Sequence, residues 1–243
     1  MNRVILNEKI IKNLARPTER EERAEKRKRQ AYTTEDVKAI LQAIDLSKIK
    51  KHKRWFYKKP RAKAIIYFFA STGCRLGAIN DLKVKDLSKI ENCYAVNFYS
   101  YSEKSKYIGF LTPEASQFLD EYLATRKDLT EDSKLFDLSY SAIRKILSRL
   151  VKKARVGGVT KITIDTRLPK KLEPREFLDI PAVHGFRSRW NTIMKLNKDI
   201  NPIMIELIMG HKPKIALDTN YFRPTKENLY LEFKKGIEDL TIF

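Results

Sequence analysis

The spacing of apolar residues along the chain predicts a mainly α-helical protein. Thr33 and Asp36 match a helix-capping signal, and apolar residues then recur every three or four positions through 37–44. A second segment, 62–70, is apolar nearly all round, as is typical of a buried helix, and it ends in a turn that contains Gly73. We therefore expect the folded domain to begin at residue 33.

Two short segments within this helical pattern have the character of strands. Residues 94–99 and 106–111 predict a hairpin, and Lys104 lies in its turn. Thr112 and Pro113 then provide the cap and first residue of a further helix. The expected fold class is accordingly α+β, mainly α with a small antiparallel β-sheet.

The next part of the chain combines a strong helical signal with an irregular stretch. Residues 141–154 predict a helix with an apolar side and a basic side. Residues 157–180 are interrupted by glycine and proline and contain one polar segment with strand character. We expect a long loop or an extra hairpin there.

Most candidate catalytic residues lie in the C-terminal third of the sequence. His184 lies three residues before Arg187 in H-G-F-R, so one helical turn would put both side chains on one face. A short apolar helix follows, capped by Asn201 and stopped by a glycine, which leaves His211 at its exit. Tyr221 stands ten residues further on. These residues predict a phosphate site with a nucleophile in reach, for which no metal is needed.

A second arginine could join this site from the first half of the chain. Arg75 follows the predicted buried helix and its Gly73 turn. Rigid neighbours would hold its guanidinium so that it can point at a phosphate. Taken alone, however, this arginine is better interpreted as part of a structural ion pair.

The composition indicates a polyanionic partner. The chain has 50 Lys and Arg against 30 Asp and Glu, a formal net charge of +20, which favours nucleic acid through counterion release. The longest apolar run, 64–70, is far shorter than the roughly 20 residues of a membrane helix. We expect an intracellular protein that does not enter a membrane. Cys74 and Cys93 match neither a disulfide framework nor a metal-ligand spacing, which fits a reducing compartment.

Three basic segments are candidates for contact with DNA. Residues 1–30 carry ten basic and five acidic side chains, and they predict either a solvated helix along DNA or a flexible arm. Residues 48–63 surround three aromatic residues with lysine and arginine, as in a surface that follows a nucleic-acid backbone or in a basic loop anchored to the core. The basic side of 141–154 is the third, although most such helix faces are merely solvated. The candidate DNA contacts are Lys51, Lys53, Arg54, Lys58, Lys59, Arg144, Lys145, Arg149, Lys152 and Lys153.

The order of the candidate site residues is itself informative. That order is Arg75, Lys104, His184, Arg187, His211 and Tyr221. It resembles the catalytic set of the tyrosine recombinases, the phage-integrase family. The resemblance rests on T-G-C-R-L-G-A-I-N-D-L, on H-G-F-R, and on L-I-M-G-H-K-P followed by Tyr221, and it spans 33–235. The context M-G-H-K-P-K-I-A-L-D-T-N-Y-F is also similar to archaeal integrases of virus or plasmid origin.

The resemblance implies a site-specific recombinase that acts on double-stranded DNA as a homo-oligomer, a tetramer, without a cofactor or metal. The Tyr221 phenol would attack a backbone phosphate, forming a 3′-phosphotyrosine and releasing a 5′-hydroxyl, and a second 5′-hydroxyl would reverse the step. Arg75 and Arg187 would stabilise the transition state, and Lys104 would protonate the leaving oxygen. The two histidines would assist as proton acceptor and hydrogen-bond donor.

The chain also departs from the family pattern. Ala78 stands where family members commonly have an acidic residue, and 157–180 is longer than expected. The basic arm, 1–32, is too short for the family's N-terminal clamp domain, so the chain is expected to be either a catalytic fragment or a minimal enzyme. Residues 33–243 would form the catalytic domain.

The C-terminal segment, 225–240, predicts a helix with one apolar face. The face consists of Leu229, Phe233, Ile237 and Leu240. It could fold back on its own core, but in the resembling family this segment docks on a neighbouring subunit. We therefore expect docking in trans.

Three other functions are alternatives to recombination. A type IB topoisomerase shares the arginine, lysine and tyrosine chemistry, but the H-x-x-R and G-H spacings and the small size favour a recombinase. A DNA-binding protein without catalysis would be equally basic. A metal nuclease is the weakest alternative, because no cluster of Asp and Glu accompanies the histidines.

Overall fold

The computed structural model describes residues 31–45, 59–127, 129–156, 159–162, 175–178, 180–211 and 222–243. These residues form mostly helices and two small antiparallel sheets, which confirms the expected fold class. In chain order the elements are α3 (Thr34–Asp45), α4 (Lys59–Thr72), α5 (Leu76–Asn80), the 3-10 helix η2 (Val84–Asp86), β1 (Leu87–Ile90), β2 (Cys93–Phe98), β3 (Tyr107–Leu111), α6 (Pro113–Ala124), α7 (Tyr140–Ala154), β4 (Val159–Ile162), β5 (Arg175–Leu178), α8 (Ala182–Leu196), α9 (Pro202–Ile208), α11 (Lys226–Lys234) and α12 (Ile237–Leu240). No described helix is long and apolar enough to cross a membrane.

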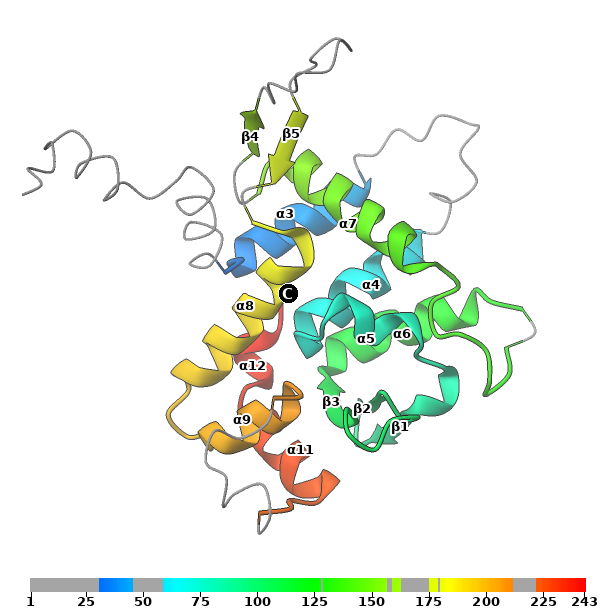
Figure 1. The fold of residues 1–243 in the computed structure, drawn as a ribbon, viewed down its shortest axis with the longest axis vertical. Coiled ribbons are helices and arrows are strands. Elements are labelled where there is room, and N and C mark those ends of the chain that lie inside the picture. The colour runs from blue at the N-terminus through cyan, green and yellow to red at the C-terminus, as the bar shows by residue number, and fades with distance from the viewer. Residues whose placement is uncertain are drawn as a thin grey trace, which may run out of the picture.

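Helix α4 lies at the centre of the molecule. It packs against α3, α6, α8 and β3, and Figure 1 shows α3 and α7 together on one side of it. All its residues from Ala64 to Thr72 are buried, as the apolar pattern predicts. The helix ends at Gly73, whose φ is +56° and whose Cβ, if present, would lie 2.8 Å from the Trp190 Cβ. Only glycine fits this turn, because both the backbone conformation and the space exclude a side chain.

Helix α3 begins at the predicted capping box. The Thr33 N–H donates to Asp36 Oδ2 at 2.9 Å, and the Asp36 N–H donates to Thr33 Oγ1 at 3.1 Å. Its apolar face is buried against α4 and α7. Tyr32, just before the cap, is also buried and packs edge-on against Phe186.

The main sheet has the strand order β1-β2-β3, with antiparallel neighbours. The predicted hairpin corresponds to β2 and β3, in which Tyr94 pairs with Leu111 and Phe98 with Tyr107. Strand β1 was not predicted from the sequence; it pairs with β2, and Ile90 lies opposite Cys93 across a two-residue turn. A second, two-stranded sheet of β4 and β5 shows that the irregular segment contains an extra hairpin, one of its two expected forms.

Two further helices begin at side-chain caps. Thr112 Oγ1 accepts from the Ala115 N–H at 3.2 Å at the start of α6, and Ser139 Oγ accepts from the Ala142 N–H at 3.3 Å at the start of α7. The apolar side of α7 is buried, as its periodicity predicts. Its predicted basic side remains largely at the surface, so α7 has the expected amphipathic character.

The C-terminal segment folds back on the core of the same chain. Gly236 separates α11 from α12, so the predicted single helix is divided. Leu229, Phe233 and Leu240 are buried in one cluster with Trp190. The last residues are fixed as well, since Glu114 accepts hydrogen bonds from the Ile242 and Phe243 N–H groups. The apolar face thus has a partner within the chain. Docking of this segment on a neighbouring subunit stays a prediction, and it would require the face to be released.

Candidate active site

Helix α8 carries the H-x-x-R pair predicted from the sequence. His184 is exposed in its first turn, and Arg187 is half-buried one turn later. Between them, a Cβ on Gly185 would overlap the Tyr32 ring, so a glycine lets α8 approach the N-terminal side of the core. The helix therefore begins tightly packed, and Arg187 projects from a fixed position.

The Arg187 guanidinium joins segments that are distant in sequence. It donates to the Gly73 carbonyl at 2.8 Å, to the Met209 carbonyl at 3.2 Å and to His211 Nε2 at 2.6 Å. Burial lowers the pKa of Arg187, and the positive charge of Arg75 lowers it further. A second cation therefore lies within electrostatic range of this buried one, and an anion between the two would relieve the repulsion.

Arg75 is presented by the turn between α4 and α5. It caps α5 with an extended backbone, φ −72° and ψ 148°, and its side chain is exposed. It forms no ion pair with any carboxylate of the described residues. The acidic residue that the family pattern would place at Ala78 is replaced by a buried methyl group.

His211 lies at the exit of α9, as the sequence predicts. Asn201 Oδ1 caps the helix by accepting from the Ile203 N–H at 2.9 Å, and Gly210 ends it with a φ of +67°. The Tyr107 ring from β3 occupies the space where a Gly210 side chain would lie. This turn fixes the direction in which the His211 ring leaves the helix.

Glu206 is a site residue that the sequence analysis did not identify. Its Oε2 lies 2.5 Å from His211 Nδ1, and its Oε1 lies 2.5 Å from Lys195 Nζ on α8. Burial acts to raise the pKa of Glu206, but the hydrogen bonds from Lys195 and His211 outweigh it, and the pKa is lowered. The available signal was weak: Glu206 is the one acidic residue in the apolar helix α9.

Lys104 lies on the exposed turn between β2 and β3, as expected. Its neighbour Lys106 forms an ion pair with Glu103 at 2.6 Å. Tyr101, also exposed on this turn, donates to Asp81 at 3.3 Å. No described contact joins Lys104 to the Arg187 cluster, which we define as Arg75, Arg187, Lys195, Glu206 and His211.

The structure brings together only part of the predicted catalytic set. Arg187 and His211 are in contact, and Arg75 lies within electrostatic range, whereas His184 is exposed without a described contact to the others. Tyr221 lies outside the described residues.

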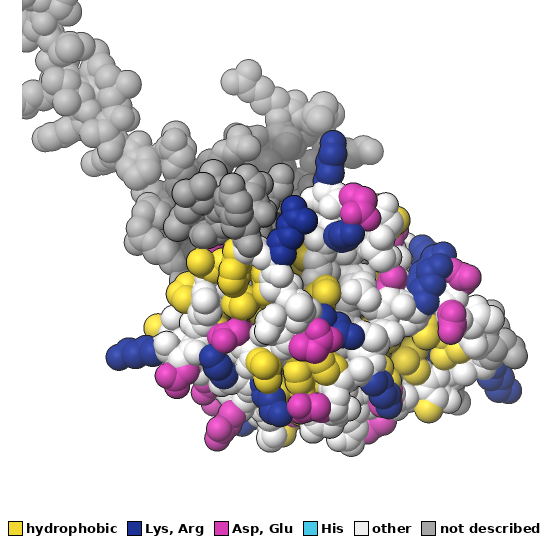
Figure 2. Space-filling view, turned by 90° about the horizontal axis from the view of Figure 1, so that it is seen from below, with side chains coloured by type: hydrophobic (Ala, Val, Ile, Leu, Met, Phe, Trp, Pro, Cys, Tyr) yellow, Lys and Arg dark blue, Asp and Glu magenta, His cyan; other side chains and the backbone are white. Residues whose placement is uncertain are grey.

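The candidate DNA-binding residues are described only in part. On α7, Arg144, Lys145, Arg149 and Lys153 are exposed and Lys152 is half-buried; Lys59, at the start of α4, is exposed. Lys51, Lys53, Arg54 and Lys58 lie outside the described residues. Figure 2 shows one face on which basic and acidic side chains alternate, so the described part of that face does not form a continuous basic surface.

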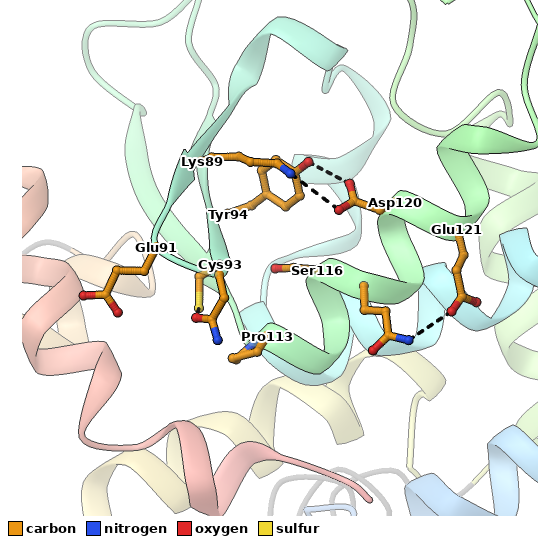
Figure 3. Close-up of a pocket in the computed structure, with 10 residues that line it drawn as sticks. Lys89, Glu91, Cys93, Tyr94, Pro113, Ser116, Asp120 and Glu121 are labelled. Carbon is orange, nitrogen blue, oxygen red and sulfur yellow. Dashed lines mark hydrogen bonds and ion pairs between the residues drawn. The ribbon is translucent and has the colours of Figure 1, made fainter.

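A groove of about 580 Å³ lies between the β1–β2 turn and α6 (Figure 3). Tyr94 donates to Asp120 at 2.7 Å, and Lys89 lies 3.8 Å from the same carboxylate. The buried Ser116 hydroxyl has no hydrogen-bond partner among the described residues. The groove shares no residue with the Arg187 cluster, so it is not part of this site.

The chain is similar to known proteins over part of its length. No protein-family model matches the chain. It is 28% identical over 155 residues to the tyrosine recombinase XerA of Saccharolobus solfataricus, covering 64% of this chain and 43% of that protein. It is 27% identical over 175 residues to the tyrosine recombinase XerC of Treponema denticola, covering 72% of this chain and 55% of that protein. The chain thus spans about half the length of the curated relatives it matches.

One solved structure bears on the fold, and a second is reported for comparison. The crystal structure of XerA recombinase matches with a TM-score of 0.50 and 21% identity, over 84% of this chain and 62% of that one. XerH recombinase bound to its difH substrate matches with a TM-score of 0.49 and 18% identity, over 76% of this chain and 47% of that one. Together with the arrangement of α8, α9 and the three-stranded sheet, the XerA match shows that this chain has the fold of a tyrosine recombinase catalytic domain.

Proposed function

We propose that this chain is the catalytic part of a site-specific DNA recombinase or integrase, which cuts and rejoins DNA strands through a 3′-phosphotyrosine intermediate. The observation that carries the proposal is the contact of Arg187 with His211, with Arg75 in electrostatic range, in a chain with the tyrosine recombinase fold. The similarity to two proteins named as tyrosine recombinases supports it.

The chemistry of these side chains suits a phosphodiester. Two carbonyls already hold the Arg187 guanidinium in place. Its position is therefore preorganised for a phosphate oxygen on which charge develops. A second arginine of the same charge is electrostatically unfavourable next to Arg187, and a bound phosphate would offset that repulsion. Cations held in this way stabilise a pentacovalent transition state more than the ground state, since the transition state carries more charge.

The remaining roles belong to the same proposal. Tyr221 is the proposed nucleophile, Lys104 the proposed general acid for the leaving 5′-oxygen, and His184 a proposed assistant in proton transfer or phosphate binding. Each of these assignments rests on the family resemblance of the motif that contains the residue.

Double-stranded DNA with a specific recombination site is the proposed substrate and partner. The net charge of +20 supports it, because a basic chain gains affinity for DNA as counterions are released. Assembly into a tetramer on two DNA sites, an origin in a virus or plasmid, and an intracellular location are part of the proposal. The candidate contacts on α4, on α7 and in 48–63 are proposed to bind DNA phosphates.

Trapping of a covalent complex tests the function directly. The protein is incubated with a randomised library of nicked duplexes, which allow the cleaved end to diffuse away, and the products are separated under denaturing conditions. A recombinase leaves a covalent protein–DNA band, and sequencing of the trapped ends gives the target site. Binding without a covalent band would instead indicate a non-catalytic DNA-binding protein. Relaxation of a supercoiled plasmid without joining of two sites would indicate a topoisomerase.

A further inference from the structure

The hydrogen bonds around His211 determine which of its ring nitrogens carries the proton. Arginine side chains only donate hydrogen bonds. Arg187 lies 2.6 Å from Nε2, so Nε2 must accept and cannot carry a proton itself. The proton of the neutral ring is therefore on Nδ1, which donates to Glu206 Oε2 at 2.5 Å.

Glu206 is well placed to impose this tautomer. Its pKa is lowered although burial acts against ionisation, because Lys195 and His211 both donate to it. An ionised carboxylate can only accept, so it stabilises the proton on Nδ1. Lys195 holds the other carboxylate oxygen at 2.5 Å and so fixes its orientation from α8. The backbone supports the same geometry, since the His211 N–H donates to the Glu206 carbonyl at 2.9 Å.

We propose that Glu206, oriented by Lys195, is a positioning residue that fixes His211 in the Nδ1–H tautomer and so holds the Nε2 lone pair against the Arg187 guanidinium. The inference rests on the proposed function for its chemical purpose, but the tautomer itself rests on the contacts alone. In the free protein the Nε2 lone pair is occupied by Arg187. When a phosphate oxygen takes over that Arg187 N–H, Nε2 becomes available to another donor.

Nitrogen NMR of the histidine rings tests the tautomer without any activity. The 243-residue chain, labelled with ¹⁵N, is measured under conditions in which the imidazole is neutral, and the His211 signals are assigned with His211→Gln. The two ring nitrogens of a neutral imidazole differ strongly in shift, so the protonated one is identified directly. We expect Nδ1–H in the wild type and a mixture, or Nε2–H, in Glu206→Gln. Nε2–H in the wild type, or an unchanged tautomer in Glu206→Gln, would overturn the inference.

Cleavage kinetics test the consequence, with a matched control at the other end of α9. Glu232 also pairs with a lysine, Lys235, at 2.8 Å, and accepts from the Asn201 N–H at 2.8 Å, but it contacts no histidine. Glu206→Gln should slow single-turnover cleavage by at least about tenfold, since a misplacement of site groups by about 1 Å can cost roughly 10²-fold in rate. DNA affinity should change less than twofold, and Glu232→Gln should leave the cleavage rate unchanged.

The outcomes separate this inference from the proposed function. Equal slowing by Glu206→Gln and Glu232→Gln would mean that Glu206 acts only through the stability of α9, which overturns the positioning role. Wild-type cleavage by Glu206→Gln would also overturn it. If the wild type never forms a covalent complex while its NMR spectrum shows the expected tautomer and its loss in Glu206→Gln, the proposed function fails and the tautomer assignment stands.

Discussion

Substitution of Gly210 by alanine should damage both the fold and the site, because two independent constraints meet at this residue. The backbone φ of +67° is unfavourable for any residue with a Cβ, at about 1–2 kcal/mol. An added Cβ would lie 2.5 Å from Tyr107 Cδ1 and 2.7 Å from Cε1. The ring cannot swing away freely, since it stacks on Phe98 with 4.7 Å between ring centroids. Overpacking of this kind costs about 1–3 kcal/mol.

The magnitude follows from these contributions. Alanine restricts the unfolded chain and recovers about 0.4–1 kcal/mol, so the free energy of unfolding of Gly210→Ala should fall by about 1–5 kcal/mol. Urea denaturation followed by circular dichroism measures this difference. Gly77→Ala is the matched control: that glycine lies in α5, and the nearest atom to an added Cβ is the Tyr99 hydroxyl at 3.6 Å. The control should be neutral or up to about 1 kcal/mol more stable, since alanine favours helix.

A double variant isolates the steric part. In a Tyr107→Leu background the ring is absent, so Gly210→Ala should cost clearly less than in the wild type, and the difference is the coupling energy of the pair. If Gly210→Ala unfolds within about 0.5 kcal/mol of the wild type, the size of an ordinary surface substitution, the account of this turn is refuted. An equal cost in both backgrounds would remove the Tyr107 contact from the explanation.

Three further predictions concern the proposed reaction. Tyr221→Phe should bind DNA normally but form no covalent adduct on denaturing gels, because the nucleophilic oxygen is gone; a persisting adduct would show that another tyrosine attacks. Arg75→Ala and Arg187→Ala should each slow single-turnover cleavage by about 10²–10³-fold with a much smaller loss of DNA affinity, and cleavage within tenfold of the wild type would remove that arginine from the site. Lys104→Ala should be rescued by a substrate with a 5′-bridging sulfur, which needs little protonation on leaving; rescue of Lys106→Ala alone would transfer the general-acid role to Lys106.

The tyrosine that follows Tyr221 in the chain is a poor alternative nucleophile. Tyr230 is buried on α11 and donates to Glu91 at 3.1 Å. Burial raises the pKa of Tyr230, and the neighbouring Cys93 and Glu91 raise it further. A neutral phenol that is buried in this way is a poor nucleophile, so Tyr221 stays the first choice for mutation.

Elements whose signal is local could be predicted from the sequence. The capping box at Thr33, the all-round apolar α4 and the Asn201 cap each depend on residues within one or two helical turns, and the structure confirms all three. The ordered motifs also identified Arg187 and His211, which the structure brings into contact. Here local propensity and the final fold agree.

The features that could not be predicted from the sequence depend on contacts between distant segments. Strand β1 is only four residues long, and it is defined by pairing with β2 rather than by its own pattern. Glu206 gains its importance from Lys195 and His211, and Lys195 lies on another helix. The C-terminal apolar face was visible as a periodicity, but a periodicity does not specify which surface covers it. At the break between α11 and α12, Gly236 lets the chain pack closely on α8, since a Cβ there would lie 2.5 Å from Met194 Sδ.

The span of the Arg187 hydrogen bonds has a consequence for the order of events during synthesis. The guanidinium bonds to a carbonyl 114 residues earlier in the chain and to groups 22 and 24 residues later. During translation the turn at Gly73 leaves the ribosome long before Arg187 exists, and the Met209 carbonyl follows later still. The arginine therefore cannot acquire its three partners until the chain has been made beyond residue 211. A ribosome-bound protein stalled before that point carries the first arginine and the main sheet, but not the assembled Arg187 cluster.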